Sequence, residues 1–142
     1  MSNDPLMQPY QLKHLTLKNR IMSTAHEPYY SEDGMPKDKY RLYHLEKAKG
    51  GCAMTMTAGS AVVSPDSPEA FGNLHAYRDE IVPWLKRLAD DCHEQGCAVM
   101  IQITHLGSRT AEGATTGNQS PLFQLVRQPR CVIWIITAQP CS

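Results

Sequence analysis

The chain has 142 residues, of which 42% are hydrophobic and 20% are charged. Its 14 basic and 14 acidic side chains give a formal net charge of zero at neutral pH. Without an excess of charge, no long-range field directs the chain to nucleic acid or to an acidic membrane surface, and we expect neither as a partner. The length suits one domain with a modest core.

The amino terminus and the apolar runs argue against export and membrane insertion. Residues 1–11 are polar and contain Asp4, so they lack the basic stretch and the apolar run of a secretory signal. The apolar run at residues 131–138 is too short to cross a bilayer. We therefore expect a cytoplasmic location.

The cysteines and histidines favour neither a disulfide framework nor a metal centre. The five cysteines are odd in number and form no CxxC pair, which favours free thiols in a reducing compartment. The six histidines show no HExxH motif and no zinc-type cluster, so no metal site is expected. The histidines on or next to expected helices, which we predict to be surface residues, are His44, His75 and His93.

The first third of the chain predicts a strand, a loop and a helix. Residues 12–19 are extended or hairpin-like, and the small and apolar residues 20–24 predict a buried strand. Two prolines and a glycine make residues 27–36 a loop. A helix is expected over residues 37–49, ended by the Gly pair at 50–51. Its side chains form two neighbouring lines, which are Tyr40, Tyr43 and Lys47, and Leu42, Leu45 and Ala48.

The middle of the chain repeats this order. Residues 52–57 predict a second strand, and residues 64–72, with two prolines, predict a loop. A one-sided helix follows, with Pro83 in its first turn and Gly96 at its end. Its apolar line is Ile81, Leu85, Leu88 and Cys92. Residues 98–103 predict a third strand.

The order strand–helix–strand–helix–strand predicts an α/β fold. Short strands that are apolar on both faces and joined by helices are typical of a parallel sheet. The loops that follow the strands are long, whereas the connections from helices to strands are tight. Because the loops after strands build the active sites of (β/α)8 barrels, this asymmetry favours a barrel over a doubly wound sheet.

The character of the sequence changes after Arg109. Only three of the residues from 110 to 142 are charged, and no helix pattern links the third strand to the strand-like run at 132–137. We therefore divide the chain into residues 1–109, the ordered α/β portion, and residues 110–142, a divergent tail that is unstructured or out of frame.

Four segments, in chain order, resemble motifs of the Old Yellow Enzyme and NADH:flavin oxidoreductase family. They are LKNRIM at 17–22, DGMP at 33–36, TAGSAV at 57–62 and IQITHLGSR at 101–109. The resemblance covers roughly residues 5–109 and implies about three βα units of a TIM (β/α)8 barrel, which needs on the order of 250 residues when complete. The position of His26 and the SPDS sequence at 64–67 are more similar to the trimethylamine dehydrogenase and N-methylproline demethylase branch than to classical ene-reductases.

The resemblance implies FMN bound across the carboxyl ends of the strands. The cofactor-binding residues that it implies are Thr24, Ala25, His26, Ser60, Ala61 and Gln102. The first three form the turn whose backbone approaches the isoalloxazine ring, the next two lie beside its pyrimidine half, and the glutamine hydrogen-bonds its polar edge. An amide both donates and accepts, and it is costly to bury without a partner. The alternatives are a small-residue strand at 23–25 and a glutamine bonded to neighbouring backbone.

Two further residues are candidates for substrate contact. Glu27 stands where the family commonly has Thr or Cys, and its carboxylate would attract a cationic amine and disfavour negative charge on reduced flavin. A solvated loop glutamate is the alternative. Tyr29 reaches the substrate or only packs. No catalytic residue is assigned, and the resemblance gives His105 a packing and hydrogen-bonding role beneath a loop.

The resemblance implies an oxidoreductase that moves hydride between an electron donor such as NAD(P)H, the flavin and a small-molecule acceptor or amine. The family's phosphate-binding loops follow the seventh and eighth strands, beyond the motifs found here. Two alternatives follow from an incomplete barrel. One is a non-catalytic truncation product, and the other is a partial barrel that self-associates through its open sheet edge.

Overall fold

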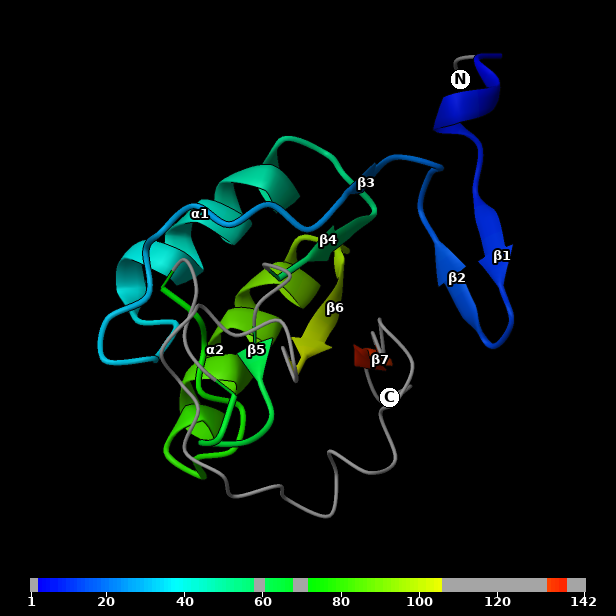
Figure 1. Ribbon diagram of the computed structural model, residues 1–142. Coiled ribbons are helices and arrows are strands. Elements are labelled where there is room, and N and C mark those ends of the chain that lie inside the picture. Colours follow the sequence, from blue (N-terminus) through cyan, green and yellow to red (C-terminus); the bar gives the residue numbers. More distant parts are fainter. Residues whose placement is uncertain (1–2, 58–60, 68–71, 106–132, 138–142) are drawn as a thin grey trace.

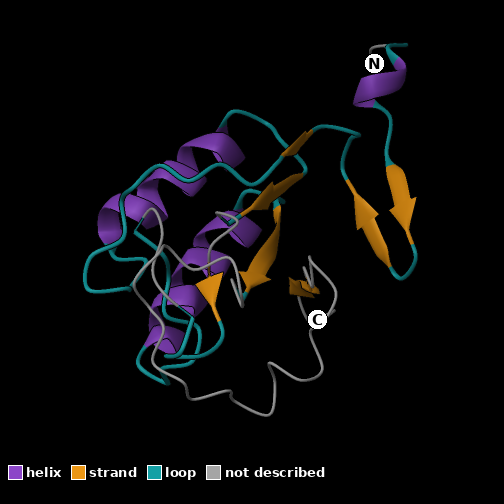
Figure 2. Cartoon of the chain, viewed as in Figure 1, coloured by secondary structure: helices purple, strands orange, loops and turns teal. Residues whose placement is uncertain are grey.

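The computed structural model describes residues 3–57, 61–67, 72–105 and 133–137. In chain order the elements are η1 (Pro5–Met7), β1 (Tyr10–Leu12), β2 (Leu15–Leu17), β3 (Met22–Ser23), α1 (Asp38–Lys49), β4 (Met54–Met56), β5 (Ala61–Val62), α2 (Ile81–Glu94), β6 (Ala98–Thr104) and β7 (Ile133–Thr137). Both helices cover one side of the main sheet, and the β1–β2 hairpin stands apart from them (Figure 1). Figure 2 shows the same separation of helices from strands.

The main sheet is built from β3, β4 and β6, which pair in parallel in that order. Met22 is level with Met54, and Met54 is level with Ala98. These strands alternate with α1 and α2, so the predicted strand–helix–strand–helix–strand order is confirmed. The short β5 was not predicted as a separate strand. It pairs in parallel with the carboxyl half of β6 and continues the edge that β4 begins.

The other edge of β6 carries β7, which runs antiparallel from Ile103↔Ile133 to Val99↔Thr137. The strand-like run at 132–137 therefore forms a strand, within the portion of the chain predicted to be unstructured or out of frame. A parallel neighbour would need a crossover of a dozen or more residues, usually a helix, whereas an antiparallel strand does not. A TIM barrel continues with a parallel strand at this edge. The direction of β7 is thus a departure from the barrel order.

The amino-terminal lead-in forms the expected hairpin, in which Tyr10 is level with Leu17. Leu17 packs with Ala53, Met54 and Ala98 at the amino ends of β4 and β6, so the hairpin covers that end of the sheet. The Lys18 ammonium donates to the carbonyl oxygen of Gln95 at the end of α2, at 2.7 Å.

The core lies between the helices and the sheet. On α1 the buried side chains are Tyr40, His44 and Ala48, a single line at four-residue spacing. The buried line thus takes Tyr40 and Ala48 from the two expected lines and adds His44, whereas Leu42 is 44% exposed. The expected surface position of His44 is wrong, because its Nδ1 lies 2.8 Å from the Thr55 hydroxyl and its ring contacts Tyr40. Polar pairing, which periodicity does not register, holds this histidine inside.

The second helix follows the prediction closely. Ile81, Leu88 and Cys92 are buried, Pro83 lies in the first turn, and Gly96 follows the end of the helix with a φ of 62°. The three described cysteines, Cys52, Cys92 and Cys97, are buried free thiols, as predicted, whereas Cys131 and Cys141 lie outside the described residues. Within the described ranges, no helix is long and apolar enough to cross a membrane.

Candidate functional site

The candidate site lies where the carboxyl ends of β3, β4 and β6 meet. Because the three strands are parallel, the residues that follow them fall at one edge of the sheet. Residues 24–26 follow β3 directly, Thr57 follows β4, and Gln102 lies in the carboxyl half of β6. The structure therefore brings three separate sequence motifs to one place.

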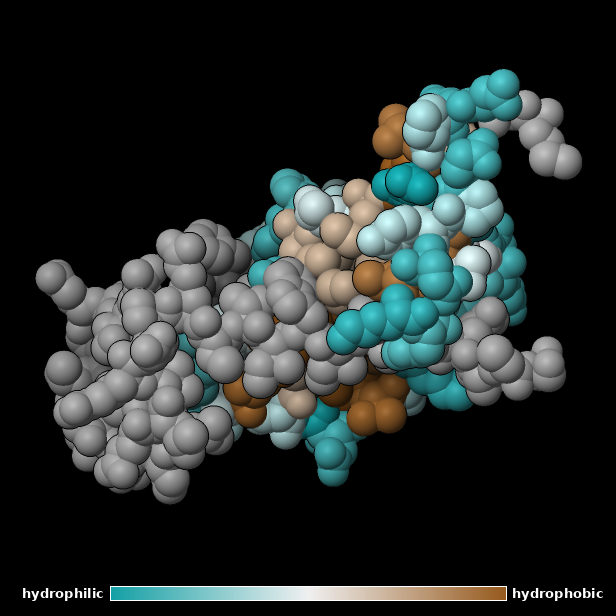
Figure 3. Space-filling model, turned by 90° about the vertical axis from the view of Figure 1, so that its right-hand side faces the viewer, coloured by the Kyte–Doolittle hydropathy of each residue, from teal (hydrophilic) through white to brown (hydrophobic). Residues whose placement is uncertain are grey.

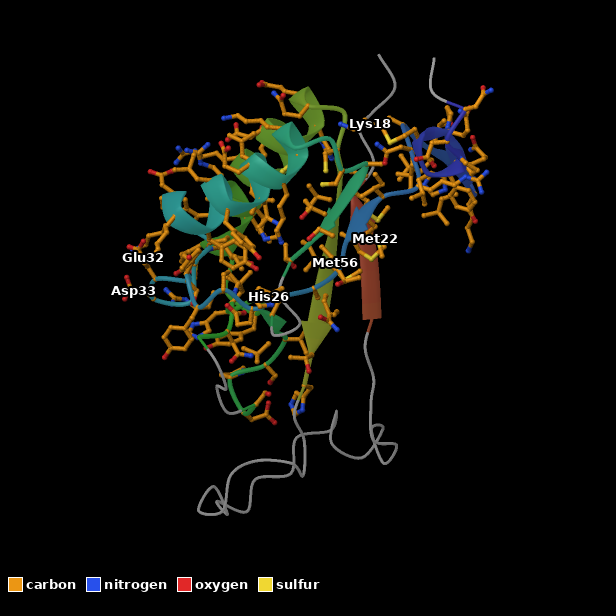
Figure 4. All side chains as sticks on the ribbon, turned by 90° about the horizontal axis from the view of Figure 1, so that it is seen from above. Lys18, Met22, His26, Glu32, Asp33 and Met56 are labelled. Atoms are coloured by element: carbon orange, nitrogen blue, oxygen red, sulfur yellow. The ribbon has the colours of Figure 1, made fainter. Side chains whose placement is uncertain are left out.

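Side-chain alternation decides which face of the sheet each residue uses. Val99, Ile101 and Ile103 pack toward the helices, in the main core. Met100 and Gln102 therefore point to the opposite face, together with Met54 and Met22, which are level with Ala98. Figure 4 shows Met22 and Met56 on neighbouring strands, with His26 beyond the end of β3 and Glu32 and Asp33 far from them.

The turn after β3 presents small, accessible residues. Thr24 and His26 are exposed, and Ala25 is half-buried. A short side chain at residue 25 leaves the backbone of this turn open to a planar ligand lying across the strand ends. That residues 24–26 approach a flavin ring stays a prediction.

The side-chain amide of Gln102 is the best-defined polar group of the site. Gln102 is half-buried, and its backbone N–H donates to the Thr57 hydroxyl at 3.4 Å. Across the described part of the chain, no hydrogen bond is found for its side-chain amide. Because Gln102 is only half-buried, its amide is open to water or to a polar ligand. The expected alternative, a bond from the amide to neighbouring backbone, is not found among these residues.

Ala61, predicted to lie beside the flavin, does not present its side chain to the candidate site. Ala61 is buried and packs in the core on the helix side of the sheet, level with Ile103. Only the backbone of Ala61 is therefore available at the carboxyl end of the sheet. Ser60 lies outside the described residues.

The candidate substrate residues form a tight turn. The Glu27 carboxylate accepts a hydrogen bond from the Tyr29 backbone N–H at 2.8 Å. Tyr29 has a φ of 57°, which is unusual for a bulky residue, and it is 72% exposed. The glutamate thus stabilises the turn, and the tyrosine ring extends into solvent.

A histidine–aspartate pair at the site was not recognised from the sequence. His105 Nε2 lies 3.2 Å from the Asp66 carboxylate, which the Ser64 hydroxyl also contacts. The His105 side chain is only 10% exposed. The pair ties the loop after β5 to the end of β6, in agreement with the hydrogen-bonding role expected for His105. The two residues are 39 positions apart, so no local spacing could reveal the contact.

No metal centre is indicated in the described part of the chain. It contains no group of three or more histidine, cysteine, aspartate or glutamate side chains that could hold a metal ion.

Comparison with known proteins places these residues in context. The chain matches the NADH:flavin oxidoreductase / NADH oxidase family over residues 5–135. It is 69% identical over 110 residues to the Probable N-methylproline demethylase of Rhizobium meliloti (strain 1021), covering 78% of this chain and 16% of that protein. It is 53% identical over 108 residues to the Multifunctional alkene reductase/demethylase OYE of Caballeronia cordobensis, covering 76% of this chain and 16% of that protein. A third relative, the N,N-dimethylglycine/sarcosine dehydrogenase of Chromohalobacter salexigens, is 43% identical over 112 residues, covering 78% of this chain and 16% of that protein.

Solved structures give the same fold. Morphinone reductase aligns with a TM-score of 0.70 at 21% identity, over 82% of this chain and 30% of that one. A 2-naphthoyl-CoA reductase aligns with a TM-score of 0.67 at 26% identity, over 72% of this chain and 16% of that one. The predicted fold class, the first part of a TIM barrel, is confirmed.

Proposed function

The chain belongs to the NADH:flavin oxidoreductase / NADH oxidase family, and from this we propose that it supplies the first part of an FMN-dependent oxidoreductase barrel. The chain spans 16% of the length of the three curated relatives described above, so the activity of a whole protein is part of the proposal. The observation that carries it is the Gln102 amide, which lacks a hydrogen-bond partner in the described residues and lies at the carboxyl end of the sheet.

The residues at this edge fit one half of an FMN molecule. Gln102 would hydrogen-bond the polar pyrimidine edge of the ring, because its amide can donate and accept at once. The backbone at 24–26 and at Ala61, with Ser60, would lie against the ring. Bound FMN would supply hydride chemistry, while the protein orients the reactants and sets the local charge. Phosphate-binding loops follow the last strands of TIM barrels, so these residues account for the ring side of the site alone.

We extend the proposal to a cationic N-methylated amine as substrate, with NAD(P)H as an alternative electron donor. The support is the naming of three relatives as a demethylase, a reductase/demethylase and a dehydrogenase of methylated glycines. Glu27 is the carboxylate nearest in sequence to the proposed flavin turn. One of its oxygens already accepts from Tyr29, so a contribution to substrate binding would be long-range attraction. A cytoplasmic location also stays a prediction.

A second candidate function is a non-catalytic partial barrel that associates with itself. The observation that favours it is the apolar surface on the side of the sheet away from the helices, where Tyr10, Ile21 and Met22 are exposed. A cavity of about 440 Å³ opens there, lined by these residues and by Leu12, Leu17, Arg20, Met54 and Met100. Figure 3 shows apolar side chains gathered on this side of the molecule. Contiguous apolar surface of this kind is a frequent protein contact.

A titration of the purified chain with FMN tests both candidates, if flavin fluorescence and oligomeric state are followed together. Saturable binding supports the first proposal. The Gln102→Leu variant keeps the side-chain volume but removes the amide, and it should weaken binding roughly two- to tenfold for one net hydrogen bond. Gln95→Leu, at the exposed end of α2, is the matched control and should bind as the wild type does.

Two outcomes would count against the flavin proposal. Equal affinity of the Gln102→Leu and Gln95→Leu variants would remove Gln102 from the site. A folded chain of defined oligomeric state that binds no FMN would favour the self-associating partial barrel.

A further inference from the structure

Two buried thiols meet at the end of the sheet opposite the candidate flavin site. Cys52 lies two residues before β4, and Cys97 immediately precedes β6. Their sulfur atoms are 3.7 Å apart, although the residues are 45 positions apart in the chain. The pairing of β4 with β6 creates this contact, since the Ala98 N–H donates to the Ala53 carbonyl at 2.9 Å just beside it.

The positions suit a covalent bond between the two sulfurs. A disulfide has an S–S distance of about 2.05 Å, so the sulfurs must approach by roughly 1.7 Å. In the β4–β6 register, which sets Met54 level with Ala98, Cys97 is one residue out of level with Cys52. A strand spacing of about 4.8 Å and a rise of about 3.3 Å per residue then put their Cα atoms roughly 6 Å apart, within the range that disulfides span. Each cysteine also follows a glycine with positive φ, Gly51 at 97° and Gly96 at 62°, and no atom lies within 4 Å of the Cβ position at Gly51.

Access differs between the two thiols. Cys52 is 8% exposed and Cys97 is 1% exposed. A small cavity of about 120 Å³ lies next to Cys97, lined also by His93, Gly96 and residues of the hairpin. A small oxidant can therefore reach the pair in two ways, through this cavity to Cys97 or directly at Cys52, which is the more exposed of the two residues.

The third buried thiol, Cys92, lies in the same core on α2, and its carbonyl oxygen accepts from the Cys97 backbone N–H at 3.0 Å. Among the described cysteines, no sulfur atoms other than those of Cys52 and Cys97 lie within hydrogen-bonding distance of each other. Burial raises the pKa of Cys92 to about 12 and raises the pKa of Cys97 as well. Since the thiolate is the reactive form, Cys97 is poorly suited to react first, and oxidation at this pair should be slow.

We propose that Cys52 and Cys97 form an oxidisable dithiol that a hydroperoxide closes into a disulfide. In the first step the Cys52 sulfur attacks the distal oxygen of the hydroperoxide and the O–O bond breaks. The hydroxyl group stays on the sulfur, and the rest of the hydroperoxide takes the thiol proton and leaves as an alcohol or, from hydrogen peroxide, as water. Cys52 is then a sulfenic acid. In the second step the Cys97 sulfur attacks it, the S–S bond forms, and the hydroxyl leaves with the thiol proton as water. The bond would join the amino ends of β4 and β6.

The test uses the reduced 142-residue chain, exposed to hydrogen peroxide, alkylated at the remaining thiols and digested for mass spectrometry. Trypsin leaves Cys92 and Cys97 on one peptide, so a second cleavage after Glu94 separates them. The expected product is a peptide pair linked through Cys52 and Cys97, with the loss of two hydrogens and two free thiols. The Cys92→Ser variant should give the same product, and the Cys52→Ser variant should give none.

The same reaction in denaturing urea shows whether the fold directs the pairing. There the native contact is absent, and the link between Cys52 and Cys97 should lose its dominance over other pairs. The proposal is overturned if the native chain links Cys92 instead, if it oxidises Cys52 without forming a link, or if native and unfolded chains give the same mixture. Because the pair is remote from Gln102, a failure of FMN binding would leave this result unaffected.

Discussion

Acidification should destabilise the fold through His44. Its side chain is completely buried, its Nδ1 is bonded to the Thr55 hydroxyl at 2.8 Å, and its ring contacts Tyr40 and Tyr43. The other nitrogen, Nε2, is buried and has no partner among the described residues. Burial, and next the positive charge of Lys47, lower the pKa of His44 to about 3. The folded chain therefore holds this imidazole neutral.

The sign follows from proton linkage. The pKa of an unfolded histidine is 6.5. Between pH 6.5 and about pH 3 the unfolded chain therefore binds a proton at residue 44 that the folded chain does not bind. Stability is therefore complete above pH 6.5 and falls as the pH is lowered, by up to about 1.4 kcal/mol per pH unit. The loss should reach roughly 2–3 kcal/mol at pH 4.5. The exposed Asp33 carboxyl, whose pKa the hydrogen bond from Lys37 lowers below 3.8, acts only at more acidic pH.

Urea denaturation at pH 7, 5.5 and 4.5 measures this dependence. His44→Asn removes the titrating group and keeps a polar side chain beside Thr55, so it should lower stability at pH 7 but flatten the dependence between pH 6.5 and 4.5. His14→Asn, in the exposed hairpin turn, is the control and should keep the wild-type slope. An unchanged slope in His44→Asn would refute the assignment of this pH dependence to His44.

Two further substitutions probe the packing. Gly34→Ala would place a Cβ 2.3 Å from the His75 ring at a φ of 74°, and thermal unfolding should show a loss of about 2 kcal/mol or more; an unaltered melting temperature would mean that the turn repacks. Leu88→Ala, at a fully buried position of α2, should lose about 2–5 kcal/mol in urea denaturation. The matched change Leu42→Ala, at an exposed position of α1, should lower the stability by less than about 1 kcal/mol. Equal losses of stability in the two variants would contradict the buried position of Leu88 and the exposed position of Leu42.

The candidate site was predictable where its residues follow strands. Residues 24–26 and Gln102 come directly from motifs at strand ends, and parallel pairing then brings them to one edge. Only the structure showed that the Gln102 amide has no hydrogen-bond partner among the described residues and that the Ala61 side chain packs in the core. It also added the contact between Asp66 and His105, which depends on how a loop folds over a strand.

The sequence alone determined the order of the elements, because helix and strand periodicity depends on neighbours a few positions apart. The one-sided pattern of α2 and the glycines that end both helices are of this local kind. Tertiary structure alone decided the burial of His44, the meeting of Cys52 with Cys97 and the antiparallel direction of β7. Each depends on register between strands or on packing between distant segments, and such long-range pairing leaves no periodic trace along the chain.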